Sequence, residues 1–70
     1  MSMEIFETPN SSNIKRIGHD GKVLVVDFKN GDSWEYDAPK SVFDEMKKSR
    51  SVGGFLAHNV KGIYNGRKRD

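Results

Sequence analysis

The chain has 70 residues and a mass of 7.9 kDa, which allows one domain and leaves no room for a second. Charged residues make up 31% and hydrophobic residues 34% of the chain, so its core must be small. The absence of cysteine excludes disulfides, thiolate metal sites and cysteine nucleophiles. No apolar run approaches the roughly 20 residues that cross a bilayer, and the N-terminal residues lack a signal-peptide pattern. We therefore expect a soluble, cytoplasmic protein without a membrane partner.

The charge is distributed unevenly along the chain. The formal net charge is only +2, but residues 1–37 hold four bases and seven acids (−3), whereas residues 38–70 hold eight bases and three acids (+5). A basic half predicts a positive face, which would concentrate anionic partners such as nucleic acid or nucleotides. The alternative is that basic side chains on short helices are simply solvated.

Three short apolar runs follow an N-terminal arm of residues 1–11 that lacks clear periodicity. They are separated by Asp20-Gly21 and Asn30-Gly31, dipeptides that favour the positive φ of tight hairpin turns. We therefore predict a three-stranded antiparallel meander over residues 14–19, 22–29 and 33–37.

The middle run is apolar on both of its predicted faces. Leu24, Val26 and Phe28 share one face, whereas Val23 and Val25 point the other way. The second face therefore needs cover, which either the N-terminal arm or a second copy of the protein would provide.

The hydrophobic period changes after residue 37. Val42, Phe43 and Met46 fall at helical spacing, and Pro39 suits an early helical position, so we predict a short helix over residues 39–48.

A second helix is predicted to begin at a Ser51 cap and to carry Phe55, Leu56 and Val60. The apolar pattern ends at Asn65-Gly66, and residues 65–70 are expected to form a mobile basic tail. The order β-β-β-α-α predicts an α+β fold, in which two short helices pack on one face of the meander. The folded domain is then expected to span residues 12–64.

The stretch Ser51-Val52-Gly53-Gly54 is the first candidate site. A hydroxyl cap followed by two glycines at a helix start exposes backbone N–H groups, and the helix dipole adds partial positive charge, which suits a phosphate. Glycine also lets a ligand approach the backbone closely. The alternative is a helix–helix turn that needs glycine for its geometry.

Basic side chains of the second half are expected to add phosphate contacts. They are Lys47, Lys48, Arg50, Lys61, Arg67, Lys68 and Arg69. If these residues bind nucleic acid, the affinity should fall steeply with salt, because counterion release drives such binding.

Trp34 and Tyr36 alternate on one face of the third predicted strand. Aromatic side chains on an exposed sheet face can stack bases, so the pair is a candidate stacking site. The alternative is core packing, because a domain this small needs every large apolar group that it has. Tyr64 is interpreted as an anchor of the last helical turn.

We expect neither an enzyme nor a cofactor or metal. The spacing of His19 and His58, the two histidines, does not support convergence with a carboxylate on a metal ion. No nucleophile can be paired with a base that a third group orients.

Several short motifs in this order resemble the KTSC domain, a family named for its occurrence at the C-terminus of some lysyl-tRNA synthetases. The resemblance covers about residues 12–64, and the motifs are Ser12-Asn13-Ile14, Ile17-Gly18-His19-Asp20, Leu24-x-Val26-x-Phe28-x-x-Gly31, Trp34-x-Tyr36, Pro39-x-x-Val42-Phe43, Ser51-Val52-Gly53-Gly54-Phe55-Leu56 and Val60-Lys61-x-x-Tyr64. The family's central Tyr-x-Tyr reads Trp34-x-Tyr36 here, which keeps an aromatic pair. The resemblance implies an α+β fold and no established activity, with RNA binding suggested by association with the synthetases.

Three functions remain open at this point. The leading hypothesis is a small non-catalytic binding module for RNA or other nucleic acid, which uses the basic helical face. The second is a nucleotide-binding or sequestering protein, as stand-alone phage relatives make conceivable, with the phosphate at the Ser51–Gly54 helix start. The third is a protein-interaction or assembly module, for which Val23 and Val25 would mediate a homodimer.

Overall fold

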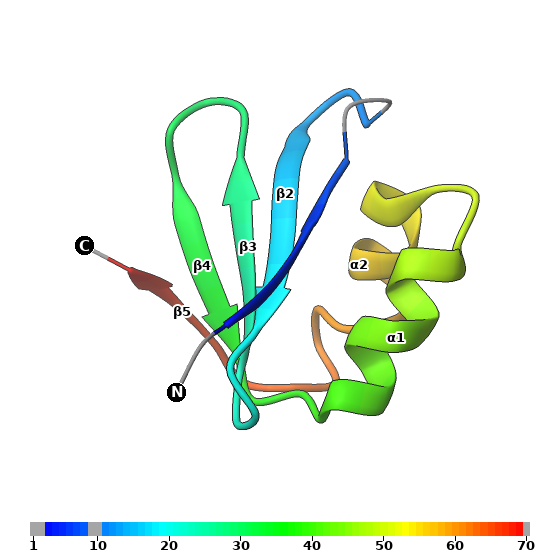
Figure 1. Ribbon diagram of the computed structural model, residues 1–70. Helices are drawn as coiled ribbons and strands as arrows, with labels where there is room; N and C mark the ends of the chain where they lie inside the picture. The colour runs from blue at the N-terminus through cyan, green and yellow to red at the C-terminus, as the bar shows by residue number, and fades with distance from the viewer. Residues whose placement is uncertain (1–2, 9–10, 70) are drawn as a thin grey trace.

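The computed structural model describes residues 3–8 and 11–69. Within them the chain forms one five-stranded antiparallel sheet and two helices, and the strands lie in the sheet in chain order (Figure 1). The elements are β1 (Glu4–Glu7), β2 (Ile14–His19), β3 (Leu24–Phe28), β4 (Ser33–Tyr36), α1 (Lys40–Lys48), α2 (Val52–Asn59) and β5 (Gly66–Arg69). Both helices come between β4 and β5, so the fold is α+β.

The predicted meander is confirmed as β2, β3 and β4, but the prediction of three strands in all is wrong, because the N-terminal arm and the C-terminal tail each contribute a strand. β1 pairs with β2 and β5 pairs with β4, so the order is β-β-β-β-α-α-β. All residues of β1 and β5 are exposed, and neither segment shows the alternation of a half-buried strand. The expectations for residues 1, 2, 9, 10 and 70 lie outside the described residues.

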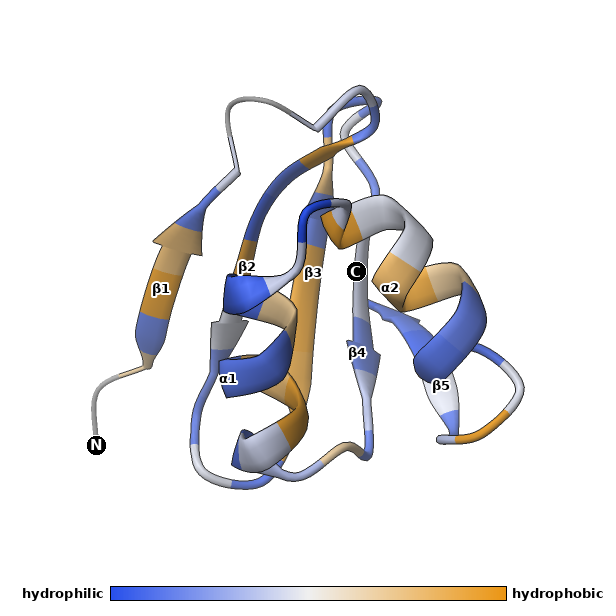
Figure 2. Cartoon of the chain, turned by 90° about the vertical axis from the view of Figure 1, so that its right-hand side faces the viewer, coloured by the Kyte–Doolittle hydropathy of each residue, from blue (hydrophilic) through white to orange (hydrophobic). Residues whose placement is uncertain are grey.

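Both helices lie on the same side of the sheet, as Figure 2 shows from that side. α1 buries Val42, Phe43 and Met46 as predicted and begins at Lys40, one residue after the expected start. α2 begins after a Ser51 cap, also as predicted, and buries Leu56. The core between helices and sheet consists of Ile14, Ile17, Leu24, Val26, Tyr36, Ala38, Val42, Phe43, Met46, Leu56 and Val60.

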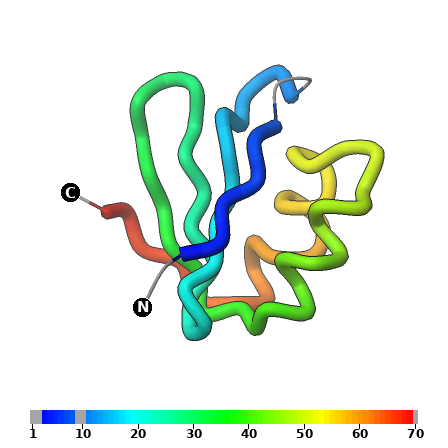
Figure 3. The backbone as a smooth tube through the Cα atoms, viewed as in Figure 1, coloured from blue at the N-terminus to red at the C-terminus, as the bar shows by residue number. Residues whose placement is uncertain are grey.

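The connection from α2 to β5 carries the chain back to the sheet (Figure 3). α2 ends at Asn59, and the chain then turns through Gly62, whose φ of +81° favours glycine. Tyr64 is half-buried against the core, whereas Ile63 is exposed. This connection brings Lys61 and Tyr64 near the end of β4, where the second candidate site lies.

A register shift in β2 places both of its isoleucines in the core. Ile14 and Ile17 are three residues apart, a spacing that would put them on opposite faces of a regular strand. The pairing with β3 shifts between Ile14 and Arg16, so one residue is absorbed and both isoleucines are fully buried. The bulge therefore lets β2 contribute two large side chains to one face.

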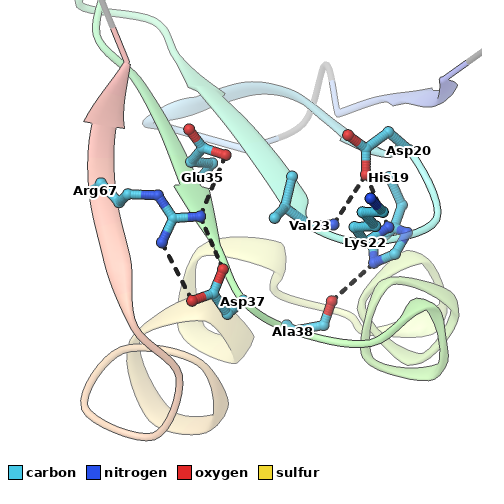
Figure 4. Close-up of polar contacts among 8 residues, drawn as sticks. All are labelled: His19, Asp20, Lys22, Val23, Glu35, Asp37, Ala38 and Arg67. Atoms are coloured by element: carbon cyan, nitrogen blue, oxygen red, sulfur yellow. Dashed lines mark hydrogen bonds and ion pairs between the residues drawn. The ribbon is translucent and has the colours of Figure 1, made fainter.

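His19 joins the sheet to the segment that enters α1. Its Nδ1 accepts from the Gly21 N–H at 3.0 Å, so the neutral ring carries its proton on Nε2 and donates to the Ala38 carbonyl at 2.8 Å (Figure 4). The ring is buried and lies 6.0 Å from the Phe43 ring. Both nitrogens are thus used within the fold, which leaves neither for a ligand.

The opposite face of the sheet is held by a polar network. The Asp27 carboxylate accepts from Arg16 Nε at 2.8 Å and from Ser33 Oγ at 2.6 Å, which ties β2, β3 and β4 together. Val25 is on this face but is only 5% exposed, and it lines a hollow of about 30 Å³ with Met3 and Ile5. The sequence left two alternatives for the cover of this face, the N-terminal arm and a second copy of the protein. At Val25 the N-terminal segment provides it.

Gly66 allows the edge strand β5 to pack on the core. It pairs with Tyr36, and a Cβ at position 66 would lie 2.5 Å from the Tyr36 ring, closer than real Cβ contacts allow. A side chain there would have to displace either the buried ring or β5 itself.

We predict that Gly66→Ala destabilises the fold by about 1–3 kcal/mol, the usual cost of overpacking. Urea unfolding of wild type and variant would measure the loss. In a Tyr36→Leu background, which removes the ring, Gly66→Ala should cost much less. An equal cost in both backgrounds would show that the contact with the ring is not the cause.

Candidate functional site

Two clefts open on the helix side of the sheet. The cap cleft, of about 560 Å³, is lined by residues 6–8, 11–13, 47 and 49–54, so it includes the turn between the helices. The aromatic cleft, of about 450 Å³, is lined by Phe28, Asn30, Asp32, Trp34, Tyr36, Lys61, Gly62, Tyr64 and Gly66. The two clefts share no residue, so the predicted phosphate site and the predicted stacking pair lie in separate places.

The aromatic cleft combines rings from the sheet and from the α2–β5 connection. Trp34 and Tyr36 are nearly parallel, with ring centroids 6.4 Å apart and planes 18° from each other. Tyr36 is only 4% exposed, and its burial raises the pKa of its hydroxyl. Trp34, Phe28 and Tyr64 are half-buried and pack against the core. Trp34 is thus better placed than Tyr36 to stack on a flat ligand.

Two of the predicted basic residues stand beside this cleft. Lys61 Nζ lies 5.9 Å from the centroid of the Phe28 ring, and no described acidic side chain pairs with it. Lys68 is opposite Trp34 in the β4–β5 register, and its Nζ is 3.4 Å from Asp32 Oδ1. The cleft therefore has apolar rings in its wall and two exposed ammonium groups beside them.

The two glycines of the cap cleft have structural reasons for being there. Ser51 Oγ accepts from the Gly54 N–H at 3.1 Å, and a Cβ on Gly54 would lie 2.9 Å from that Oγ. A Cβ on Gly53 would lie 2.9 Å from Asn13 Oδ1. Among the described residues, the backbone N–H groups of Val52 and Gly53 have no acceptor. The helix start thus keeps two free donors, although packing already accounts for the glycines.

Acidic side chains weaken the positive charge of the cap cleft. Lys47 Nζ pairs with Glu4 at 2.7 Å and with Asp44 at 3.4 Å, and it lies over the Phe43 ring. The hydrogen bond to Glu4 raises the pKa of Lys47, and the same bond lowers the pKa of Glu4. Glu7 also lines the cleft. Lys48 and Arg50 are exposed and neither forms an ion pair within the described chain, but Arg50 lines the cleft and Lys48 does not.

Arg67 and Arg69 lie on the opposite face of the sheet from the helices. Arg67 makes a two-pronged contact with Asp37, at 2.8 and 3.2 Å, and lies 3.5 Å from Glu35 (Figure 4). The hydrogen bonds that Arg67 donates to Asp37 lower the pKa of the Asp37 carboxyl group and raise the pKa of Arg67. In register, Arg69 is opposite Ser33.

The predicted basic face is therefore divided among three places. Lys61 and Lys68 flank the aromatic cleft, Lys47, Lys48 and Arg50 stand at the end of α1, and Arg67 and Arg69 lie on the far face. Side chains alternate between the two faces of a strand, so Lys68 points to the opposite face from Arg67 and Arg69. Assignment of the tail as a strand would have predicted this separation from the sequence.

Sequence reasoning missed three residues of the aromatic cleft in this role. The sequence pattern predicts Phe28 as a core residue and Tyr64 as a helix anchor, and it indicates no function for Asp32. The hairpin at Asn30-Gly31 was the available signal for Phe28 and Asp32, because these two residues pair across the three-residue loop Lys29-Asn30-Gly31.

Two further kinds of site were sought in the described residues. No group of three or more histidine, cysteine, aspartate or glutamate side chains there could hold a metal ion. None of the helices in that part of the chain is long and apolar enough to cross a membrane.

Comparison with known proteins agrees with this architecture. Residues 10–64 match the KTSC domain. The chain belongs to the KTSC domain family. Its structure is also similar to the crystal structure of a KTSC domain protein from Yersinia pestis, with a TM-score of 0.84 and 26% sequence identity over 99% of this chain and 100% of that one. No curated protein matches the chain. The KTSC match excludes β1 and β5, whereas the structural match includes both edges.

We predict that this KTSC protein loses stability in acid. In the fold, hydrogen bonds from Lys47 and Arg67 lower the pKa of Glu4 and Asp37, respectively. Burial raises the pKa of Asp27, but bonds from Ser33 and Arg16 outweigh it and leave that pKa below its ordinary value. A carboxyl group whose pKa is lower in the folded state binds fewer protons when folded. Its contribution to the free energy of unfolding is therefore complete above the unfolded-state pKa and is lost progressively as the pH falls from that value through the folded-state pKa.

The urea midpoint should therefore stay constant from pH 7 to about pH 5 and fall below about pH 4, where unfolded carboxyl groups begin to protonate. Asp37→Asn should flatten this fall. The matched control is Glu45→Gln, an exposed residue of α1 without an ion pair in the described structure, which should leave it unchanged. An Asp37→Asn profile as steep as that of the wild type would contradict the assignment.

Proposed function

We propose that this protein is a small non-catalytic binding module for single-stranded nucleic acid, RNA in the first place. Bases would enter the aromatic cleft, and Lys61 and Lys68 would contact the phosphates. The observation that supports this most directly is the combination of half-buried rings and two flanking ammonium groups in one cleft.

The aromatic side chains favour a flat ligand. Stacking of a base on an aromatic side chain is worth roughly 1–3 kcal/mol and tolerates any sequence, because every base has a π-face. Trp34 is held by core contacts and by the adjacent Tyr36 ring, so little conformational freedom would be lost on binding. Its ring is already positioned in the free protein.

The two lysines favour a ligand that carries phosphates. Lys61 has no described acidic partner, and Lys68 has one, at 3.4 Å. Neither ammonium group is buried, so a phosphate could reach both without a change in the backbone. The names of the family and of its Yersinia member state no ligand, so the proposal rests on this geometry.

Trp34 is the single tryptophan of the chain, so its fluorescence reports directly on this cleft. We expect a short single-stranded RNA of mixed sequence to quench it saturably. Lys61→Gln and Lys68→Gln should each weaken binding and should each reduce the slope of log affinity against log salt by about 0.7, the value for one phosphate contact on a single strand.

Lys22→Gln is the matched control, because it removes the same charge from an exposed position that lines neither cleft. It should leave the affinity close to that of the wild type. If Lys22→Gln weakens RNA binding as much as the other two variants, only a diffuse charge effect is present. If Lys61→Gln and Lys68→Gln leave the affinity unchanged, the aromatic cleft is ruled out as the binding site. Single-stranded DNA of the same sequence tests the preference for RNA.

The cap cleft supports a second candidate, the binding of a free nucleotide. The observation that favours it is the pair of unused N–H groups of Val52 and Gly53 beside Arg50. Glu4 and Glu7 argue against it, because a phosphate would meet two carboxylates close to the same cleft.

If the cap cleft binds a nucleotide, backbone NMR signals of residues 50–54 should shift when a mixture of nucleotides is added. Arg50→Gln should weaken that binding, whereas Lys22→Gln should not. Shifts confined to residues around Trp34 and Tyr64 would exclude the cap cleft and support the aromatic one. The homodimer stays a prediction, but Val25 no longer supports it, because the chain itself buries that side chain.

A further inference from the structure

We infer that the aromatic cleft prefers guanine among the bases and that the Asp32 carboxylate reads it. This inference rests on the proposed function, because it concerns the ligand of the same cleft. The observation that carries it is a carboxylate held in place at the rim of a ring-lined cleft, with acceptor capacity to spare.

The backbone fixes the position of Asp32. It follows the β3–β4 turn, and its carbonyl accepts from the Phe28 N–H at 2.8 Å. Asn30 Oδ1 accepts from the Asp32 N–H at 2.9 Å, and the Gly31 N–H donates to the Phe28 carbonyl at 3.1 Å. The turn is therefore bonded on both sides of Asp32, so its side chain projects from a defined point beside the rings of the cleft.

The carboxylate keeps room for a ligand. Its described contacts are both long, 3.4 Å from Asn30 Nδ2 to Oδ2 and 3.4 Å from Lys68 Nζ to Oδ1. Its side chain is 42% exposed. An ionised carboxylate offers about four lone-pair sites, so these two contacts leave capacity on both oxygens. Two adjacent donors of a ligand can therefore bind the two oxygens together.

A carboxylate only accepts hydrogen bonds, and this limits which base edge it can read. Guanine presents two adjacent donors, N1–H and the N2 amino group, which match the two oxygens of a carboxylate. Adenine and cytosine each present one amino group beside a ring-nitrogen acceptor, and uracil presents one N–H between two carbonyl oxygens. Each of these three would place an acceptor against the carboxylate, which costs free energy that guanine does not lose.

A purely structural role for Asp32 is the competing explanation. The ion pair with Lys68 joins the β3–β4 turn to the edge strand β5, and its loss would disturb the cleft indirectly. The two roles predict different effects on base preference when the partner, Lys68, loses its ammonium group. If Asp32 acts through Lys68, removal of the ammonium group should have the same effect on base preference as removal of the carboxylate.

The test uses the full chain and seven-nucleotide RNAs of uridine with guanosine, adenosine, cytidine or inosine at the centre. Quenching of Trp34 fluorescence at one fixed salt concentration gives the affinities. We expect the guanosine oligomer to bind at least about fivefold more tightly than the adenosine oligomer, the low end for a bidentate base contact. Inosine lacks the N2 amino group, so the inosine oligomer should lose most of this advantage.

Asp32→Asn and Asp32→Ser should bring the ratio of guanosine to adenosine affinity to within about twofold of one, because each removes the paired acceptors. Thermal unfolding shows whether each variant is folded, and the second variant serves if the first is not. Lys68→Met breaks the same ion pair but leaves the carboxylate, so it should weaken all oligomers alike and keep the ratio.

The possible failures can be told apart. Equal binding of all four oligomers by the wild-type protein overturns the guanine inference and leaves the proposed function intact. A guanine preference that survives in both Asp32 variants, or one that disappears equally in Lys68→Met, shows that Asp32 does not read the base. No binding of any oligomer overturns the proposed function and this inference with it.

Discussion

The small core of this chain depends on two short helices that cover one face of a five-stranded sheet. α1 has nine residues and α2 has eight, so each spans only about 12–14 Å along its axis. Five strands spaced about 4.8 Å apart make a sheet wider than the helices are long. The largest buried side chains belong to β2, β3, α1, α2 and the residue after α2, so the helices are anchored over the middle of the sheet. The two clefts open beside this region, where less of the sheet is covered.

The charged residues of the chain act mainly on its edges. β1 is held by Glu4 to α1 and by Glu7 to Arg16, while β5 is held by Arg67 and Lys68 to β4 and its flanking residues. The side chains of these pairs are exposed or half-buried, so each pair contributes little by itself to stability, but together they connect both edge strands to neighbouring elements. Three of the predicted phosphate ligands, Lys47, Arg67 and Lys68, take part in these same pairs. Lys47 and Arg67 in particular are already engaged within the chain, which makes them weaker candidates than Lys61.

Electrostatics and shape together favour the aromatic cleft over the cap cleft as the ligand site. The cap cleft has free N–H groups and Arg50, yet Glu4 and Glu7 offset much of its positive charge. The aromatic cleft has two lysines against one carboxylate and a wall of rings that would otherwise face water. In so small a core, the half-buried rings of this cleft contribute less hydrophobic stabilisation than fully buried rings would. A ligand that stacks on them would remove their remaining apolar surface from water.

Much of the fold could be predicted from local patterns in the sequence. Asp20-Gly21 and Asn30-Gly31 located the hairpin turns, helical spacing located α1, and Ser51 located the start of α2, because turns, amphipathic periods and caps depend on residues close together in the chain. The paired aromatic residues and Lys61 and Lys68 were also recognised as candidates from the sequence. The edge strands were not, because β1 and β5 are exposed throughout and are ordered by pairing with residues distant in sequence. Strand alternation then decided that Lys68 stands at the aromatic cleft and that Arg67 and Arg69 face away, and the hairpin and the α2–β5 connection brought Phe28, Asp32 and Tyr64 to the same place. These juxtapositions arise from hydrogen bonds between strands and from packing across the core, which no local pattern encodes.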